Sequence, residues 1–379
     1  MNKLNEDALE LHRKNRGKLE IKAKVSIENK HDLSLAYTPG VGYVSSEIGK
    51  DKKLARELTL KGNSVAIVSD GSAILGLGNL GPEAAIPVME GKAVLFKRFA
   101  NIDGFPICLA TQDTEEIIKA VKYIAPVFGG INLEDIAAPR CFEIERRLRE
   151  ELSIPVMHDD QHGTAVVVLA GLINAIKAAG LKKEDAKVVV SGAGAAGVAV
   201  VKMLLAFGLV DIIVCDSRGT LNEKRTDLEN EKKELSMTTN PRGITGSLAD
   251  AILGADIFIG VSRAGVLTEE MAHSMGAKPI IFALANPVPE IMPDIAKRAG
   301  AFIVATGRSD FPNQVNNVIA FPGIFRGALD NRIKQFKSAM FIKAAENLAS
   351  LVKNPGVENI LPSVFDKGVA EAVADAIRE

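Results

Sequence analysis

Two pairs of adjacent carboxylates stand in parts of the chain that are otherwise apolar or rich in glycine. Glu134 and Asp135 follow a glycine-rich stretch, and Asp159 and Asp160 follow an apolar run that resembles a buried strand. Adjacent acids are usually solvated surface, but unpaired carboxylates in apolar surroundings cost free energy. Hard oxygen ligands from two segments suit Mg²⁺ or Mn²⁺, and the absence of paired cysteines argues against a thiolate zinc site. The two pairs therefore indicate a divalent-cation site.

A glycine-rich loop between an apolar strand and an apolar helix has the pattern of a dinucleotide site. It contains Gly192, Gly194 and Gly197. The first glycine permits the tight turn, the second lets the backbone approach a pyrophosphate, and the third lets the helix pack on the strand. The next strand ends in Asp216, at the spacing of about 20 residues expected for an acid that binds the ribose hydroxyls. The loop therefore predicts NAD or NADP as cofactor.

The residues after that strand leave the choice between the two cofactors open. Asp216 favours NAD, because a carboxylate repels a 2′-phosphate. Arg218 stands two residues further on, and an arginine there can accept that phosphate. The two indications conflict.

A second match to the glycine pattern, at residues 76–81, stands in a different context. No strand-end acid lies at the required spacing, and Pro82 and Pro87 are expected to interrupt the helix that follows. We interpret this segment as a loop whose backbone lies close to a ligand or to facing backbone.

Several other polar residues stand where they could act on a ligand. Lys92 precedes a wholly apolar run, so it either extends its amine to solvent or is a catalytic base with a lowered pKa. Tyr37 adjoins a Pro-Gly turn, where a structural role is the ordinary one. Asn286 ends a predicted strand and Asn317 lies in a loop, where an amide can hold a carboxylate or the nicotinamide, or form a turn. His162 stands four residues after His158, but the segment between them lacks the glutamate of the zinc-protease pattern. We interpret His162 as a residue at a helix start.

Strands and helices alternate along the chain, which predicts parallel α/β layers. The first half has apolar runs at 64–69, 106–110 and 154–158, and a helix capped by Thr111 or Asp113. A long apolar helix over 163–178 precedes five buried runs that predict a second, doubly wound Rossmann-type sheet. The predicted organisation is a smaller α/β substrate and metal domain over residues 1–161, a dinucleotide domain over 162–322 and C-terminal helices over 323–379 that pack back on the first domain.

Composition excludes several classes of function. The 379 residues allow two or three domains, and 46 Lys and Arg against 47 Asp and Glu leave no strong field for nucleic acid or an anionic membrane. Aromatic residues make up 5% with no Trp, which argues against base-stacking platforms. Three cysteines without a paired motif, and an N-terminus without an apolar signal region, predict a cytoplasmic protein. No apolar run is long enough to span a bilayer.

The motifs together resemble the malic enzyme family, in particular its short bacterial and archaeal branch. They run in order along most of the chain, and several are long and uncommon. The segments begin at Tyr37 (YTPGV), Ser69 (SDGSAILGLGNLGP), Pro87 (PVMEGKAVLFK), Gly129 (GGINLED), His158 (HDDQHGTA), Ser191 (SGAGAAG), Leu284 (LANP) and Thr306 (TGRSDFPNQVNNVIAFPG).

The resemblance implies oxidative decarboxylation of (S)-malate to pyruvate and CO₂ with reduction of NAD⁺ or NADP⁺, and an assembly that is a homodimer or larger. It implies Tyr37 as general acid, Lys92 as general base and Asp159 as support for the base. The implied metal ligands are Glu134, Asp135 and Asp160, the implied substrate residues are Asn286 and Asn317, and the implied cofactor residues are Gly192, Gly194, Ala195, Ala196, Gly197, Asp216, Arg218 and Asn286.

One position departs from the family pattern, and a malolactic enzyme and a nucleotide-binding regulator are alternatives to the implied function. Ala73 stands where larger family members carry an arginine that binds the substrate carboxylate. A malolactic enzyme would keep the cofactor bound and release lactate instead of pyruvate. A nucleotide-binding regulator with a decayed site would have lost the acids or Lys92, and all of them are present.

Overall fold

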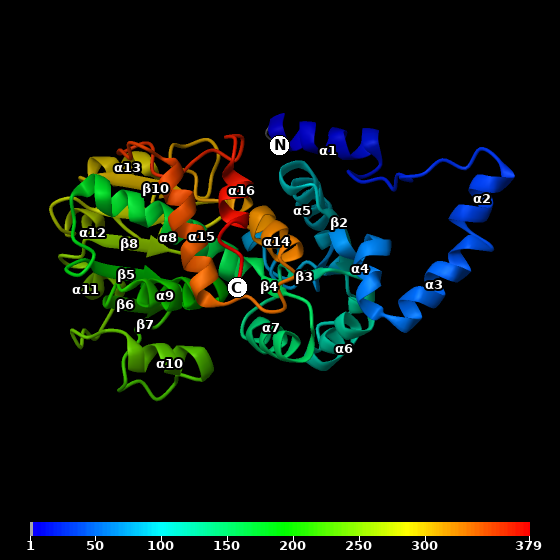
Figure 1. Ribbon diagram of the computed structural model, residues 1–379. Coiled ribbons are helices and arrows are strands. Elements are labelled where there is room, and N and C mark those ends of the chain that lie inside the picture. The colour runs from blue at the N-terminus through cyan, green and yellow to red at the C-terminus, as the bar shows by residue number, and fades with distance from the viewer. Residues whose placement is uncertain (1–2) are drawn as a thin grey trace.

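The computed structural model describes residues 3–379 and contains two parallel α/β layers joined by helices (Figure 1). The first sheet has four strands in the order β2-β1-β3-β4, all parallel. Its strands are β1 (Ser64–Ser69), β2 (Asp103–Cys108), β3 (Gly130–Leu133) and β4 (Val156–His158). The central strands are fully buried on both faces, which explains their continuous apolar character.

The second sheet has six strands in the order β10-β9-β8-β5-β6-β7. All neighbours are parallel except the short β7, which returns antiparallel to β6. The strands are β5 (Lys187–Ser191), β6 (Asp211–Asp216), β7 (Gly219–Thr220), β8 (Ile257–Gly260), β9 (Ile280–Ala283) and β10 (Ile303–Thr306). The order reverses at β5, as in a doubly wound sheet, so the predicted fold class is confirmed.

Helices from the sequence between the strands cover both sheets. The first sheet is flanked by α5 (Pro82–Ala100), α6 (Thr114–Ile124) and α7 (Arg140–Glu151). The second sheet is flanked by α9 (Ala195–Phe207), α10 (Asn230–Thr238), α11 (Leu248–Ile252), α12 (Glu269–His273) and α13 (Pro293–Arg298). Of the two predicted caps for α6, Asp113 is the one whose side chain accepts the capping hydrogen bond, from Glu116 N.

The long apolar helix α8 (Asp159–Ala179) connects the two layers (Figure 1). It packs against α9 and against the C-terminal helix α15 (Ser338–Leu351). By length and composition α8 could cross a membrane, but 72% of its most apolar stretch is buried inside the protein. Its hydrophobicity is therefore that of a core helix.

Of the C-terminal helices, α14 (Phe321–Asp330) returns to the first layer, as predicted, whereas α15 packs on α8. The helix α14 packs on α5, where Phe96 makes edge-to-face contacts with Phe321 and Phe325 at ring separations of 4.8 and 5.5 Å. The last helix, α16 (Val369–Ala374), packs on α14.

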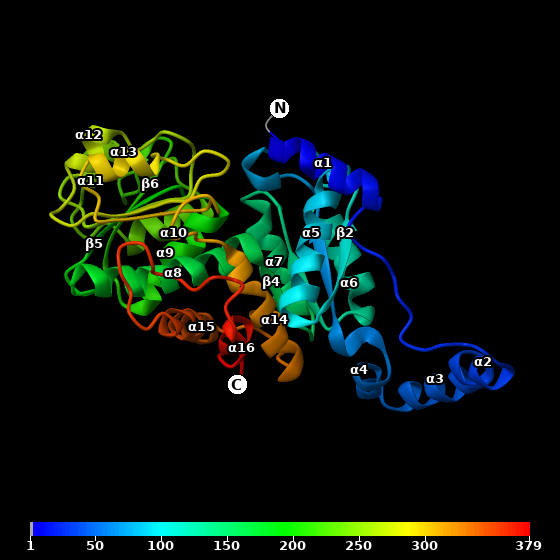
Figure 2. The same ribbon diagram turned by 90° about the horizontal axis from the view of Figure 1, so that it is seen from above.

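The N-terminal segment forms an arm that leaves the body of the molecule. It contains α1 (Lys3–Asn15), α2 (Lys30–Ala36) and α3 (Gly40–Lys50), and none of these helices buries a side chain. Figures 1 and 2 both show α2 and α3 projecting away from the two sheets, and the short α4 (Ala55–Leu58) leads back to β1. Between α1 and α2, residues 16–29 form neither helix nor strand.

Three other details correct the predicted elements. The strands β3 and β7 were not expected, because β3 is short and begins at a glycine and β7 has only two residues. The prolines do not interrupt α5: Pro82 occupies the first helical turn, where a missing N–H is tolerated, and the helix continues through Pro87. Burial of Met89 and Phe96 against the sheet offsets the hydrogen bond lost at Pro87.

Candidate functional site

A cavity of about 950 Å³ lies where the two layers meet. The first layer contributes Lys92, Glu134 and Asp135 to its lining, and the second contributes Ala196 and Asn286. Ligands of open α/β sheets bind at the carboxyl ends of the strands, and these residues follow such ends or the helix starts beside them. The cavity therefore has the position of an active site.

The four carboxylates meet at one edge of the first sheet. Glu134 and Asp135 follow β3, and Asp159 and Asp160 form the first turn of α8 directly after β4. The two strands are neighbours, so their carboxyl ends place both pairs together. One ligand oxygen each from Glu134, Asp135 and Asp160 lies within 4.8 Å of the others, which is a spacing that could hold one cation.

Asp135 has the most unusual surroundings of the acids in this cluster. Its backbone is held in the left-handed region, at φ 53°, and its N–H donates to Asp160 Oδ2 at 2.9 Å. Its own Oδ2 is buried and has no hydrogen-bond partner among residues 3–379. Burial, followed by repulsion from Asp160, raises the pKa of Asp135 to about 7. A buried orphan oxygen in an all-carboxylate donor set fits Mg²⁺ or Mn²⁺.

Lys92 is the counter-ion of this cluster. Its side chain is 7% exposed, and Nζ lies 2.5 Å from Asp159 Oδ2 and 2.9 Å from Glu134 Oε1. Burial lowers the pKa of Lys92, but the charges of Asp159 and Glu134 outweigh it, so the pKa is raised above the ordinary value. The amine also lies 4.1 Å from the centre of the Phe321 ring, which closes one side of the cavity. Lys92 therefore does not extend to solvent, and in this arrangement it is charged.

Asp159 lies behind Lys92 and has no exposure to the cavity. It fits there because Gly163, one turn further along α8, has no side chain. A Cβ on Gly163 would lie 1.8 Å from Asp159 Oδ1 and 3.3 Å from the Cβ of Asn317. The glycine thus allows Asp159 and the cavity-lining Asn317 to share this space.

An outer layer of polar contacts, which the sequence analysis did not identify, orients the acids. His158 Nε2 lies 3.2 Å from Asp160 Oδ2, and Gln161 donates to His158 Nδ1 at 2.9 Å. Buried Glu145 accepts from the backbone N–H of His158 at 3.1 Å and pairs with His162 at 2.9 Å. His162 is thus held by Glu145, in agreement with its predicted structural role. Glu145 lies in an ordinary charged helix, so no local pattern could have identified it.

The loop that carries the second glycine pattern packs closely on facing backbone, as predicted. A Cβ on Gly71 would lie 2.1 Å from the carbonyl oxygen of Gly81, and one on Gly76 would lie 2.5 Å from that of Asn286. Buried Asp70 anchors the start of the loop by accepting from Arg140 at 2.9 Å. The loop therefore links the carboxylate side of the cavity to Asn286.

The three glycines of the dinucleotide loop have distinct surroundings. Gly192 has φ +118°, and a Cβ there would lie 2.5 Å from the carbonyl oxygen of Val261. A Cβ on Gly197 would lie 1.9 Å from the carbonyl oxygen of Gly192, so this glycine permits the close helix-to-strand contact. Gly194 has no atom within 4 Å of such a position and is open to a ligand. This arrangement is the one expected of a pyrophosphate-binding turn.

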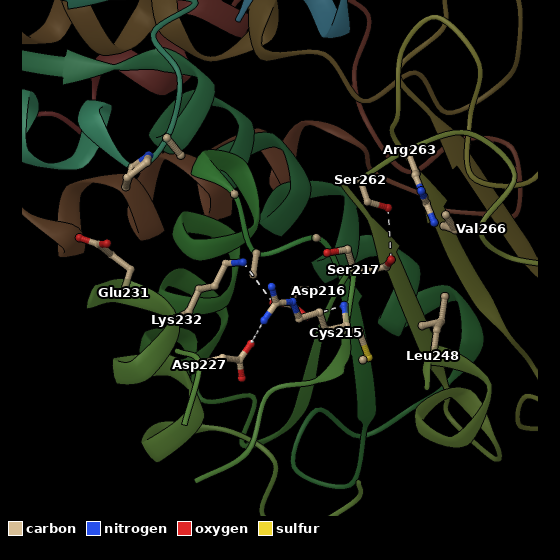
Figure 3. Close-up of a pocket in the computed structure, with 18 of the residues that line it drawn as sticks. Cys215, Asp216, Ser217, Asp227, Glu231, Lys232, Leu248, Ser262, Arg263 and Val266 are labelled. Atoms are coloured by element: carbon tan, nitrogen blue, oxygen red, sulfur yellow. Dashed lines mark hydrogen bonds and ion pairs between the residues drawn. The ribbon is translucent and has the colours of Figure 1, made fainter. Parts of the chain in front are cut away.

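A second cavity, of about 1020 Å³, begins at this turn and extends along the end of β6. Gly192, Gly194, Asp216 and Arg218 are among its lining residues. It shares Ser262 and Arg263 with the first cavity, so the two are adjacent on either side of the α9 N-terminus. Figure 3 shows Asp216, Asp227 and Lys232 on one side of this cavity and Ser262 and Arg263 on the other. An extended dinucleotide can span both cavities.

The remaining predicted residues are not all brought to the cavities. Asn286 and Asn317 line the first cavity, whereas Ala195 lines neither and packs against the first layer. Tyr37 is 67% exposed on the N-terminal arm and lines neither cavity. Ala73 lines the first cavity, as expected for its place in the motif.

Two cations that the sequence analysis did not single out lie at the first cavity. Lys18 lines it and donates from Nζ to the carbonyl oxygen of Pro87 at 2.7 Å, and Arg263 lines it from the loop after β8. Both side chains bring positive charge to the cavity that Ala73 also lines. Lys18 lies in the segment without regular structure, so no periodic pattern marks it.

A doubly wound sheet with a dinucleotide turn, beside a cavity of buried carboxylates and one lysine, defines a nicotinamide-dependent oxidoreductase. Two family models match the chain: the malic enzyme N-terminal domain over residues 16–149 and the malic enzyme NAD binding domain over residues 161–378. The chain belongs to the malic enzyme family.

Individual relatives agree with this assignment. The chain is 57% identical to the bifunctional malic/malolactic enzyme of Bacillus subtilis, over 99% of this chain and 92% of that protein. It is 55% identical to the NAD-dependent malic enzyme of Geobacillus stearothermophilus, over 96% of this chain and 76% of that protein. The crystal structure of the NAD-dependent malic enzyme of Thermotoga maritima superposes with a TM-score of 0.95 at 52% identity, covering 98% of this chain and 99% of that one.

Proposed function

We propose that this protein is a malic enzyme that converts (S)-malate and NAD⁺ or NADP⁺ to pyruvate, CO₂ and the reduced cofactor. The single observation that carries the proposal is the first cavity, where Lys92 and the acids face Ala196 of the dinucleotide helix and Asn286 across one space. We assign the substrate and metal region to residues 1–161, the dinucleotide region to 162–322 and the returning helices to 323–379.

Glu134, Asp135 and Asp160 are the residues that would hold Mg²⁺ or Mn²⁺. When bound, the cation would withdraw electrons from the C2 oxygen of malate and the nicotinamide would accept the hydride from C2. Asn286 and Asn317 offer amide N–H groups to the substrate carboxylates.

Lys92 is placed to take the proton of the C2 hydroxyl, and Asp159 holds its amine in position. A base must be neutral to accept a proton, and Lys92 is charged while Glu134 and Asp159 face it without a cation. A cation held by Glu134 would remove part of that stabilisation and would lower the Lys92 pKa toward the range of a working base. Tyr37 returns a proton to C3 after CO₂ has left.

Tyr37 lines neither cavity of its own chain, so in this role it would act from a second chain. In one chain the arm with Tyr37 buries none of the side chains of α2 and α3, and it exposes Leu33, Leu35 and Tyr43. Exposed apolar side chains on a projecting element are typical of a subunit interface. We therefore propose a homodimer in which the arm of each chain covers the other chain.

A malolactic reaction is the second candidate, and the name of the Bacillus subtilis relative favours it. Both reactions consume malate, but only the malic enzyme reaction accumulates reduced cofactor. The test is an initial-rate assay at 340 nm with malate, Mn²⁺ and each cofactor in turn, with pyruvate and lactate measured as products. Pyruvate equal to the reduced cofactor supports the proposal, and lactate without reduced cofactor contradicts it.

We further propose that the protein works in the cytoplasm. Cys108, Cys141 and Cys215 are all free thiols, which is typical of proteins kept in a reducing compartment. Fractionation of cells that express the tagged protein tests this location.

A further inference from the structure

The carboxylate of Asp216 has no acceptor position left for a ligand. Its side chain is 7% exposed, at the end of β6. Oδ1 accepts from the backbone N–H of Arg218 at 2.9 Å and from Arg225 Nη1 at 2.8 Å. Oδ2 accepts from Arg225 Nη2 at 3.2 Å and from Lys232 Nζ at 3.1 Å. A carboxylate offers about four lone-pair positions, and here all four are occupied.

This occupancy changes what Asp216 can do for a dinucleotide. An acid that selects NAD must accept from the ribose 2′-hydroxyl and repel a 2′-phosphate. Asp216 does neither while Arg225 and Lys232 bond to both of its oxygens and compensate its charge. Its position identifies it instead as the anchor of a group of cations.

The cations around Asp216 outnumber the acids that contact them. Arg218, Arg225 and Lys232 carry three positive charges, and Asp216 and Asp227 carry two negative charges. Glu229 and Glu231 also line this cavity but form no ion pair with the group. In Figure 3, Glu231 is directed away from Asp216, whereas Lys232 is directed toward it.

Two of the three cations keep free donors at the cavity. Arg218 is 72% exposed and uses Nη1 on Asp227, which leaves Nη2 and Nε. Lys232 is 41% exposed, and one of its three N–H groups is used on Asp216. A guanidinium fork and an ammonium group that line the same cavity suit the oxygens of a phosphate monoester.

We propose that this group of cations selects NADP by binding the phosphate on its adenosine ribose, with Arg218 and Lys232 as the phosphate ligands and Asp216 and Arg225 as positioning residues. This proposal rests on the proposed function in one respect: both proposals place a dinucleotide in the second cavity. It resolves the conflict between Asp216 and Arg218 in favour of the phosphate.

The test uses calorimetry on the intact protein with adenosine 2′,5′-bisphosphate and adenosine 5′-monophosphate as probes. One additional charged contact of this kind is worth about tenfold in affinity, so the bisphosphate should bind at least about tenfold more tightly. Equal or weaker binding of the bisphosphate overturns the proposal.

Variants locate the effect. Lys232→Met and Arg218→Gln should each lower the bisphosphate affinity about tenfold and leave the monophosphate affinity unchanged. Lys233→Met is the matched control, because Lys233 is the next residue of α10, is exposed and does not line the cavity. An equal loss for both probes in Lys232→Met and Arg218→Gln, or the same loss in Lys233→Met, overturns the assignment.

The two probes contain no nicotinamide and need no malate or metal. A bisphosphate preference without malate oxidation would therefore contradict the proposed reaction alone. Malate oxidation with a preference for the monophosphate would contradict this inference alone.

Discussion

The central residue of the first cavity is a lysine whose charge state depends on its neighbours. Lys92 is surrounded by Asp159, Glu134 and the Phe321 ring, and it partly compensates a cluster of four carboxylates. The lysine and the cation would thus share the same negative charges. Under the proposed mechanism, this sharing would make the lysine available as a base only in the loaded site.

Replacing the lysine should remove turnover and leave cofactor binding intact. We expect Lys92→Ala to lower kcat about 10²–10⁴-fold, the usual contribution of a general base. Binding of the reduced cofactor, followed by its fluorescence, should be unchanged. Lys97→Ala is the control, because Lys97 lies on the same helix and pairs with Asp103 at the surface. Wild-type turnover in Lys92→Ala would remove this residue from the mechanism.

The acid with the orphan oxygen should make cation binding depend on pH. The pKa of Asp135 is raised from its ordinary value of 3.8 to about 7, so below pH 7 a cation competes with a proton. Without metal, the proton bound by the folded state adds stability below pH 4 that is lost as the pH rises through 7. We therefore expect the increase in Tm caused by Mn²⁺ to grow between pH 6 and pH 8.

Thermal melts with Mn²⁺ and with EDTA across this range check the expectation. Asp135→Asn should abolish most of the Mn²⁺ shift and its pH dependence. A shift that is constant with pH in the wild type would show that Asp135 is ionised before the cation binds.

At the scale of elements, the start of α8 carries the site, because this helix begins at the acids and continues into the core. The same helix contains two glycines, Gly163 and Gly171, and each lies close to a different side chain. A Cβ on Gly163 would meet Asp159 Oδ1 at 1.8 Å, and a Cβ on Gly171 would meet the Phe282 ring at 3.2 Å. The first glycine serves the site, and the second serves packing between α8 and the second sheet.

Alanine at these two positions should separate activity from stability. We expect Gly163→Ala to displace Asp159, to lower kcat by at least about tenfold and to cost about 1–3 kcal/mol of unfolding free energy. Gly171→Ala should cost stability with kcat unchanged, because it lies three turns from the acids. Urea unfolding and initial rates measure both. Equal kcat in the two variants would argue against the positioning of Asp159 by this helix.

At the scale of the whole molecule, the N-terminal arm is the feature that one chain leaves unexplained. It holds Tyr37 away from both cavities and exposes apolar side chains along α2 and α3. A dimer in which the arms are exchanged would bury these side chains and bring each tyrosine to the site of the other chain.

Mixing two inactive variants tests this arrangement. If Tyr37 acts on the other chain, a heterodimer of Tyr37→Phe and Lys92→Ala has one complete site and one site with both defects. Random reassortment of the subunits should then restore about a quarter of the wild-type activity. If both residues act within one chain, each site of the heterodimer has one defect and the mixture stays inactive.

The sequence determined the local features of this protein, because they depend on neighbouring residues. Apolar runs, the Asp113 cap, the spacing of Gly192, Gly194 and Gly197 and the strand-end acids all follow from side-chain size, polarity and backbone freedom over a few positions. These local features were sufficient to predict the fold class. Together with the resemblance of the motifs, they were also sufficient to predict the family. The same locality explains the errors at β3 and Pro87, where burial from distant segments decided the structure.

Only the tertiary structure decided which charges face one another. The pairing of Lys92 with Asp159 joins residues 67 positions apart, and that of Asp216 with Lys232 joins residues on different elements. Electrostatic energy depends on distance and burial, and neither can be read from sequence separation. The sequence could thus name the acids and the lysine, but their charge states, the occupied oxygens of Asp216 and the distance of Tyr37 from the site are consequences of packing.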